Sequence, residues 1–291
     1  MVCGIKISKV IFLEEFPENN FQKNSFFFSN SDGELLSQMN KLNGLKFTKK
    51  ENYIKLEGSL HLFHNNGTQN YDEFTYSKIC KTIDHLISTK KIDAKKSIIN
   101  NIEFGVNIEL PFPVSLILNK IVTFKGSPFS HEKNLNINSR VCKNSQIHIK
   151  MYDKGLQFDL NKNLLRFEVK IKRMQFHQNK GIDIRNLADL KIYRNYPKVI
   201  DLIKSIFDEI LFEEDNFDQR LLSTKDLIFY LRIINPNYWL NSQNQSAAEK
   251  KKMNREKIKY KSLIEKNCIG KPYSYLISDE INIQLNKLLK N

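Results

Sequence analysis

The stretch "LLRFEVKIKR" (residues 164–173) decides the fold class of this chain. Its apolar side chains take every second position and alternate with Arg166, Glu168, Lys170 and Lys172. A period of two is typical of a β-strand that buries one face and leaves the other face polar. The stretch therefore predicts a strand of an antiparallel sheet whose apolar face packs against helices.

Two further stretches show the same alternation. They are "NIEFGVNIELPF" (101–112) and "QIHIKMYDKG" (146–155), and the second one ends in the turn sequence Asp153-Lys154-Gly155. The polar positions of these two strands are Glu103, Gly105, Asn107, Glu109, Gln146, His148, Lys150 and Tyr152. Such a polar face is either an ordinary solvated surface or a binding site, and the alternation alone does not distinguish the two.

The remaining pattern predicts an α+β protein. Residues 1–75 are β-rich, with "YIKLEGSLHLFH" (53–64) as one strand, and residues 126–145 are polar and predict a loop. Helical spacing of apolar residues predicts helices over 72–89, 113–124, 183–193 and 196–212. We expect a central, mostly antiparallel β-sheet with helices on one face, followed by a small helical C-terminal module.

The acidic stretch "EEDNFD" (213–218) predicts a domain boundary, which gives a domain over 1–215 and a helical basic module over 216–291. In that module, "STKDLIFYLRII" (223–234) and a long segment from about Ala247 to Lys266 predict helices. A length of 291 residues suits one large domain or two smaller ones.

The charge balance indicates an anionic partner. The chain has 46 Lys and Arg against 32 Asp and Glu, a formal net charge of +14. Nucleic acid is the first candidate and a membrane surface the second. A proteome rich in Lys and Asn would also supply part of this excess.

The cysteines and the N-terminus indicate a reducing compartment. Cys3, Cys80, Cys142 and Cys268 are far apart and form no CxxC pair, so we expect free thiols and no zinc site. The N-terminal apolar run contains charges and is a poor signal peptide. No apolar run approaches the ~20 residues of a membrane span, so we expect a cytoplasmic protein and no membrane partner.

The polar faces of the three strands are candidates for a groove that binds a polyanion. Carboxylates suit such a groove only if a divalent cation lies between them and the phosphate, and Glu109 or Glu168 with His148 would supply ligands for Mg²⁺ or Mn²⁺. A tyrosine hydroxyl beside that metal could attack phosphorus. Lys150 and Lys154 would lower the pKa of the tyrosine or hold the phosphate.

Four segments, in this order, resemble the filamentous-phage gene II replication endonucleases and their phage and plasmid relatives. They are "GSLHLFHNNGTQNYDEF" (58–74), "FGVNIEL" (104–110), "IHIKMYDKG" (147–155) and "LLRFEVKIKRMQF" (164–176). The resemblance covers roughly residues 55–195, and its most specific parts are the segment order and the RFE strand. The sequence is most similar to relatives from low-GC Bacteroidetes phages and mobile elements.

The resemblance implies a sheet-based nicking domain, related to the HUH endonucleases, that initiates rolling-circle replication. By motif position Tyr152 matches the tyrosine that cleaves one strand and stays on the 5′ phosphate, and Lys154 matches the lysine after it. Arg166 and Glu168 match the RFE pair. The chain departs from the family pattern at Leu62, Gln69 and Asn107, which stand where the family has Lys, His and Asp, and it has no His-x-His pair.

We therefore predict a tyrosine-dependent DNA endonuclease and ligase of a bacterial cytoplasm, with host replication proteins as candidate partners. Its predicted catalytic residues are Tyr152, Lys154 and Lys150. A divalent cation, Mg²⁺ or Mn²⁺, is predicted on His61, His148, Glu109 and Glu168, with His61 chosen because it lies in the first family segment. The predicted DNA contacts are Arg166, Lys170, Lys172, Lys250, Lys251, Lys252 and Arg255, the last four from the basic run "EKKKMNREKIKYK" (249–261).

Alternatives remain at each step. The basic run also suits a plain solvated helix face. His85, His131 and His177 are expected in solvent, and Tyr193 and Tyr196, a rival nucleophile pair, are expected to serve packing because Pro197 follows them. The alternative function is a DNA-binding or RNA-binding protein of a phage or mobile element without nicking activity.

Overall fold

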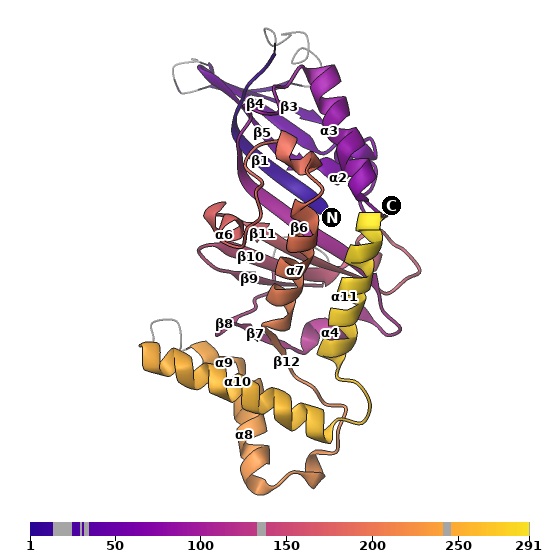
Figure 1. Cartoon of the computed structure of the whole chain (residues 1–291), viewed down its shortest axis with the longest axis vertical. Helices are drawn as coiled ribbons and strands as arrows, with labels where there is room; N and C mark the ends of the chain where they lie inside the picture. Colours follow the sequence, from indigo (N-terminus) through magenta and orange to yellow (C-terminus); the bar gives the residue numbers. More distant parts are fainter. Residues whose placement is uncertain (14–24, 30, 32–34, 133–137, 241–245, 291) are drawn as a thin grey trace.

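A nine-stranded sheet forms the centre of the molecule, with the strand order β2-β3-β4-β5-β1-β6-β11-β10-β9 (Figure 1). The computed structural model describes residues 1–13, 25–29, 31, 35–132, 138–240 and 246–290. Every neighbouring pair of strands in this sheet is antiparallel. The strands are β1 (Val2–Val10), β2 (Ser25–Ser29), β3 (Leu35–Leu42), β4 (Leu45–Lys50), β5 (Tyr53–Ser59), β6 (Ile99–Glu109), β9 (Ser139–Lys143), β10 (Ile147–Asp153) and β11 (Leu164–Ile171).

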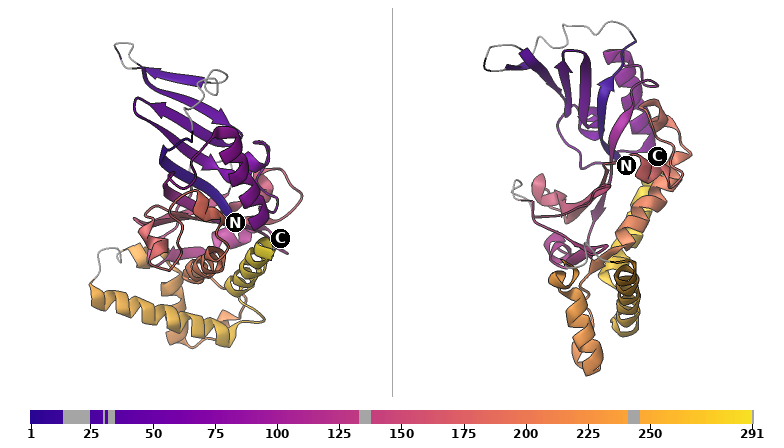
Figure 2. Two further views of the ribbon diagram at one scale, coloured as in Figure 1. Left: turned by 45° about the horizontal axis from the view of Figure 1, so that its top comes forward. Right: turned by 90° about the vertical axis from the view of Figure 1, so that its left-hand side faces the viewer.

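Helices cover one face of this sheet, and Figure 2 shows the two layers from the side. The alternation in the sequence explains this arrangement, because Phe104, Ile149 and Phe167 all point to the helical side and are fully buried. The predicted α+β class, with an antiparallel sheet and helices on one face, is confirmed. The main helices of this layer are α2 (Leu60–His64), α3 (Tyr76–Lys90), α4 (Val114–Asn119), α7 (Asn195–Asp208) and α11 (Tyr273–Lys290).

A second, smaller core lies below the main one in Figure 1. Trp239, Tyr230 and Tyr260 are buried in it, and the indole nitrogen of Trp239 donates a hydrogen bond to the carbonyl of Ile233 at 2.7 Å. Three helices contribute to it, and it lies against one side of a three-stranded sheet in the order β12-β7-β8, from which Val122 and Leu211 point into it. These elements are β7 (Ile121–Phe124), β8 (Ser127–Pro128), β12 (Ile210–Phe212), α8 (Thr224–Ile234), α9 (Pro236–Leu240) and α10 (Ala247–Asn267).

Helix α11 belongs to the main core and not to this smaller one. Its residues Ile277, Ile281 and Leu285 are fully buried against the main sheet and α7. The C-terminal helix thus packs on the main core, while the strands β7 and β12 contribute residues to both cores. The division into 1–215 and 216–291 stays a prediction.

Three apolar runs that were each predicted as a single element contain two elements, one helix and one strand. A short apolar run does not distinguish the two by its periodicity. Residues 53–64 contain β5 and α2, residues 113–124 contain α4 and β7, and residues 196–212 contain α7 and β12. The predicted loop over 126–145 contains β8 and β9, and the predicted helix over 183–193 is only the short 3-10 helix η1 (Ala188–Lys191).

All four cysteines are free thiols, as predicted. Among the described residues, no helix is both long and apolar enough to cross a membrane. The short helices α5 (Lys154–Gln157), α6 (Gln175–Gln178) and η2 (Gln219–Leu221) complete the fold.

The smaller core gives a stability prediction. Ile264 of α10 is 3% exposed, whereas Ile258 on the same helix is 69% exposed. Ile264→Ala should lower the free energy of unfolding of this core by about 2–5 kcal/mol, because it leaves a cavity. Ile258→Ala should change it by less than about 0.5 kcal/mol. The fluorescence of Trp239, the one tryptophan of the chain, reports the transition during urea unfolding. Equal shifts for both variants would contradict this packing.

Candidate functional site

Three neighbouring strands place the predicted site residues next to one another on the polar face of the sheet. In the register of the sheet, Tyr152 of β10 lies opposite Arg166 of β11, and Arg166 lies opposite Asn107 of β6. Glu168 is two residues along β11 and therefore on the same face. Tyr152, Arg166, Glu168 and Asn107 therefore share one face of the sheet, as the alternation in the sequence predicts.

The guanidinium group of Arg166 joins these strands. Its Nε donates to Glu168 Oε1 at 3.0 Å, its Nη1 donates to Asn107 Oδ1 at 3.0 Å, and its Nη2 donates to the thiol sulfur of Cys3 on β1. Arg166 is 3% exposed. Gly105 leaves room for it, since a Cβ atom at that position would lie 2.7 Å from Nη2. The buried charge is therefore paired and hydrogen-bonded, which buried ionic groups require.

The hydroxyl group of Tyr152 is held by this network. It donates to Glu168 Oε1 at 3.1 Å, the same oxygen that Arg166 contacts. We expected Tyr152 on an open face, but its side chain is only 5% exposed. Burial, followed by the nearby charge of Glu168, raises the pKa of Tyr152 far above its usual range. In this conformation the phenol is neutral and covered.

The ammonium group of Lys154 lies on the other side of the Tyr152 hydroxyl. Its Nζ donates to Asn70 Oδ1 at 2.5 Å, to Gln157 Oε1 at 2.9 Å and to the Tyr152 oxygen at 3.3 Å, which uses all three of its donors. Lys154 is 1% exposed. Burial, followed by the positive charge of Arg166, lowers the pKa of Lys154 to about 7. Its charge therefore changes near neutral pH.

A small cover lies over the tyrosine and the lysine. Helix α5 begins at Lys154 directly after β10, and Phe158, which follows this helix, lies 4.6 Å below the lysine ammonium. The ring of Phe158 contacts the ring of Tyr71 edge-on at 5.1 Å. The cover thus consists of α5 and the segment that carries Asn70 and Tyr71, joined by side-chain contacts alone.

Lys150, the third predicted catalytic residue, is engaged elsewhere. Its ammonium forms an ion pair with Glu132 at 2.8 Å and lies 5.0 Å from the centre of the Tyr152 ring. It adds positive charge beside the tyrosine but does not contact the hydroxyl group.

His61 is buried and not at the surface or a sheet edge. It lies in α2, is 1% exposed and stacks on Phe74 with ring centres 4.7 Å apart. Its Nε2 donates to Asp72 Oδ1 at 2.6 Å, while its buried Nδ1 has no hydrogen-bond partner among the described residues. Burial lowers the pKa of His61 to about 3, despite the opposing hydrogen bond to Asp72, so the ring is neutral.

The four predicted metal ligands do not form one site. Glu109 is 59% exposed at its side chain and pairs with Lys162 at 3.2 Å. His148 lies opposite Lys170 and Lys143 in the register of the sheet, while His61 and Glu168 have the partners given above. Among the described residues, no group of three or more His, Cys, Asp or Glu side chains could hold a metal ion. The donors present here do not fit a Mg²⁺ or Mn²⁺ site.

The predicted DNA contacts lie in two places. Lys170 and Lys172 follow Arg166 along and beyond β11. Lys251, Lys252 and Arg255 are exposed on α10, and Lys250 lies on the same helix with a side chain outside the described part. The first group lies on the main sheet and the second on α10, so the predicted DNA contacts lie on two separate parts of the fold.

Two other sequence predictions have clear outcomes. His177 is fully buried, and its Nε2 hydrogen-bonds to the carbonyl of Ile184 at 3.0 Å, so the expectation of a solvated ring was wrong. Tyr196 is also buried, and both it and Tyr193 contact the ring of Tyr76. The tyrosine pair serves packing, as predicted.

Sequence patterns missed the residues that reach the site from other segments. Asn70 lies in an irregular stretch and Gln157 in a four-residue helix, and neither is long enough to show a periodicity that places a side chain. Cys3 lies on β1, and only the sheet register brings it to Arg166. Asp72 lies before Thr75, the N-cap of α3, and its carboxylate pairs with His61 and Lys78.

The polar face gives a pH-dependence prediction through Glu103 of β6. Burial, followed by the charge of Glu168, raises the pKa of Glu103 to about 7. A raised carboxyl pKa stabilises the fold below pH 4.5, and this stabilisation is lost as the pH rises to about 7. Glu103→Gln has no carboxyl group at this position and should not show this loss. The free energy of unfolding of the variant minus that of the wild type should therefore grow by roughly 3 kcal/mol as the pH rises from 4.5 to 7.5. Urea unfolding at each pH measures it. A constant difference between the two proteins across this range would contradict the raised pKa.

Comparison with known proteins gives a similarity in structure and no match in sequence. No protein-family model matches the chain, and no curated protein sequence matches it. The chain is similar in structure to a rolling circle replication initiator protein from Geobacillus stearothermophilus, with a TM-score of 0.39 and 10% sequence identity over 81% of this chain and 96% of that chain. The proposals below rest on the residues of this chain and not on this similarity.

Proposed function

We propose that this protein nicks and joins DNA through Tyr152 and initiates rolling-circle replication. One observation carries the proposal: the Tyr152 hydroxyl lies between the carboxylate of Glu168, at 3.1 Å, and the ammonium of Lys154, at 3.3 Å. A base on one side and a cation on the other are the groups that activate a weak oxygen nucleophile. The motif resemblance of residues 147–155 and 164–176 to the gene II type endonucleases assigns the same tyrosine.

The proposed reaction uses these groups in a defined order. Glu168 accepts the phenol proton along the existing hydrogen bond, and the positive charge of Lys154 stabilises the phenolate oxygen. That oxygen forms a bond to the scissile phosphorus, the bond from phosphorus to O3′ breaks, and O3′ takes a proton from water. The product is a 5′-phosphotyrosine with a free 3′-hydroxyl, and attack by a 3′-hydroxyl reverses the step and joins the strand.

The charges around the hydroxyl favour a phosphate in this place. Arg166 and Lys154 contribute two positive charges, and the carboxylate of Glu168 compensates only one of them. A phosphodiester would supply the missing negative charge and raise the pKa of Lys154, because an opposite charge nearby favours the ammonium form. Substrate binding would thus charge the lysine that the reaction needs.

Access to the tyrosine requires the cover to move. Asn70 contacts the Lys154 ammonium, the rings of Tyr71 and Phe158 are in contact, and Asn107 of β6 donates to the carbonyl of Tyr71 at 2.9 Å. Opening of the cover has to break these contacts, including the hydrogen bond to β6. The predicted Mg²⁺ or Mn²⁺ has no fitting site among the described residues, so we assign it no step, and its requirement stays a prediction.

Tyr152→Phe should abolish the covalent protein–DNA adduct and leave DNA affinity within about twofold. The variant removes only the nucleophilic oxygen, and the net cost of one lost hydrogen bond is on the order of 1 kcal/mol. The assay uses a supercoiled circle with the origin of the element, with Mg²⁺, Mn²⁺ or EDTA, and scores open circles and protein on the 5′ end. Tyr193→Phe, at a half-exposed tyrosine, is the matched control and should behave as wild type. An adduct that persists in Tyr152→Phe would exclude this nucleophile.

Lys154 gives the pH dependence of the reaction. Because its pKa is lowered to about 7, the fraction of charged lysine falls as the pH rises through 7, and the adduct rate of the free enzyme should fall with it. Lys154→Arg keeps the charge and should remove this fall, whereas Lys154→Met should be slow at every pH. Single-turnover adduct rates between pH 6 and 9 measure this. A wild-type rate that rises across the range would mean that the neutral amine acts instead.

The second candidate is a DNA-binding protein without nicking activity. The burial of Tyr152 and the rise of its pKa favour it, since a neutral and covered phenol is a poor nucleophile. Wild-type protein that binds the origin but forms no adduct under any of the metal conditions above would support this candidate over the enzyme.

A further inference from the structure

A polar groove lies between the main sheet and the helical module, away from Tyr152. It has a volume of about 800 Å³. Lys143 and Gln146 line it from the turn between β9 and β10, Lys125 lines it from the turn between β7 and β8, and Asn254 and Lys257 line it from α10. Two turns and one helix from both cores therefore form its walls.

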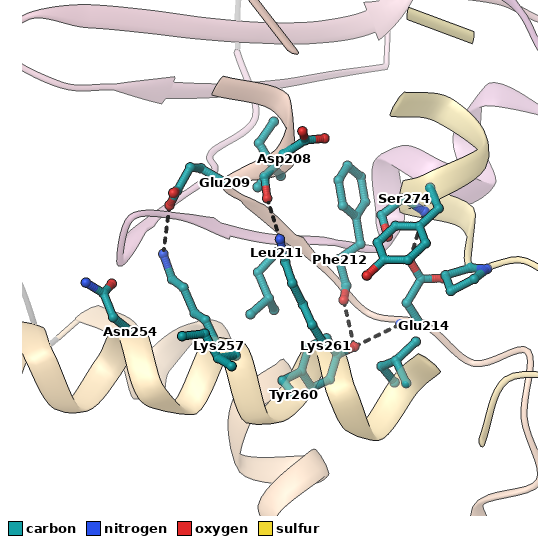
Figure 3. Close-up of a pocket in the computed structure, with 15 residues that line it drawn as sticks. Asp208, Glu209, Leu211, Phe212, Glu214, Asn254, Lys257, Tyr260, Lys261 and Ser274 are labelled. Carbon is teal, nitrogen blue, oxygen red and sulfur yellow. Dashed lines mark hydrogen bonds and ion pairs between the residues drawn. The ribbon is translucent and has the colours of Figure 1, made fainter. Parts of the chain in front are cut away.

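The groove carries an excess of positive charge. Lys125 and Lys143 are exposed, and neither forms an ion pair with any described residue. Lys257 is more buried, and its ammonium lies 3.8 Å from Glu209, the one acidic side chain among the described residues that line the groove. Figure 3 shows Lys257 extending from α10 toward Glu209 with Asn254 one turn before it. Two lysine charges thus remain for an anionic ligand.

The other groups of the groove suit nucleotides. The amide side chains of Asn144, Gln146 and Asn254 offer donors and acceptors, and the partly buried ring of Phe176 forms part of the wall. A positively charged groove with an aromatic side chain is the usual arrangement for single-stranded nucleic acid. Its volume matches a pocket that encloses a small ligand. It therefore has room for a few nucleotides of one strand but not for a duplex.

The position of the groove relative to Tyr152 supports this ligand. Strand β10 begins at Ile147, which lines the groove, and reaches Tyr152 five residues later, about 17 Å away at the rise of a strand. His148 and Lys150 lie between them on the polar face, and Lys170 lies opposite His148. His148, Lys150 and Lys170 thus occupy the polar face of the sheet along the length of β10 that separates the groove from the tyrosine.

A second cavity, of about 290 Å³, lies beside α10 (Figure 3). Hydrogen bonds between residues that line it attach α10 to the rest of the fold. Lys261 donates to the carbonyl of Asp208 at 2.9 Å, and the Tyr260 hydroxyl donates to the carbonyl of Phe212 at 2.7 Å. These bonds fix α10 to α7 and β12, so the helical wall of the groove is a rigid part of the fold.

We propose that this groove binds single-stranded DNA beside the nick site and guides it along β10 to Tyr152. The proposal rests on the proposed DNA-nicking function, and it assigns Lys125, Lys143 and Lys257 as phosphate contacts, with Phe176 as a stacking surface for a base. Its contacts are to the backbone and to one base face, so it would contribute affinity more than sequence selection.

The test compares two charge-reversal variants of the full chain. Lys125→Glu with Lys143→Glu changes the groove, while Lys95→Glu with Lys290→Glu makes the same change in net charge at two exposed lysines outside it. The probe is a fluorescent single-stranded DNA oligonucleotide, titrated at several salt concentrations, with a duplex and an RNA of the same sequence as competitors. The groove variant should bind roughly tenfold more weakly or worse, and the slope of log affinity against log salt should shrink by about 1.4 for two lost contacts.

Each outcome decides one of the two proposals. If the groove variant binds the oligonucleotide as tightly as the control variant does, the groove proposal is wrong. Stronger competition by duplex or RNA than by single-stranded DNA would also overturn the groove proposal. The covalent adduct of Tyr152, measured with a saturating substrate, reports the nicking function separately and should survive in the groove variant. Wild-type protein that forms an adduct while the groove variant keeps its affinity would leave the nicking proposal intact and refute the groove alone.

Discussion

The buried guanidinium of Arg166 is the interaction on which the polar side of the sheet depends. It bonds to Cys3 of β1, Asn107 of β6 and Glu168 of β11, and so ties three strands together on a face that no helix layer covers. Removing one partner of such a buried charge costs about 3–5 kcal/mol, because the other charge is left unpaired. The glycine at position 105 follows from this requirement, since any side chain there would meet the guanidinium.

The chemistry of the site follows from the same charge. Arg166 orients Glu168, and Glu168 accepts the hydroxyl of Tyr152 through the same oxygen. Its positive charge also contributes to the low pKa of Lys154, although burial is the larger cause. Tyr152, Glu168 and Lys154 are therefore arranged around one buried charge. In the proposed reaction these groups keep their positions, and the cover over the hydroxyl has to open.

The sequence predicted which residues share the polar face, because side chains two residues apart on a strand always point to the same side of the sheet. Once 147–153 and 164–171 are strands, Tyr152, Arg166 and Glu168 must share a face, and pairing in this register brings them into contact. The sequence could not show that Asn70 and Gln157 contact the lysine, because an irregular segment and a four-residue helix are too short to show a period. It also could not show that His61 and Glu109 face different surroundings, since His61 lies in a short helix that the apolar pattern of 53–64 presents as strand. The metal site was predicted from the polar faces of the strands, with His61 added from a family segment, and the described residues do not assemble it.

The direct measurement of the central claim is the identity of the residue that carries DNA after cleavage. Wild-type protein is incubated with an oligonucleotide of its origin, digested with protease and nuclease, and analysed by mass spectrometry. The account predicts a single modified peptide, with a 5′-phosphonucleotide on Tyr152 in the segment that contains β10. A modification on any other residue, or a nicked product with no modified peptide, would contradict it.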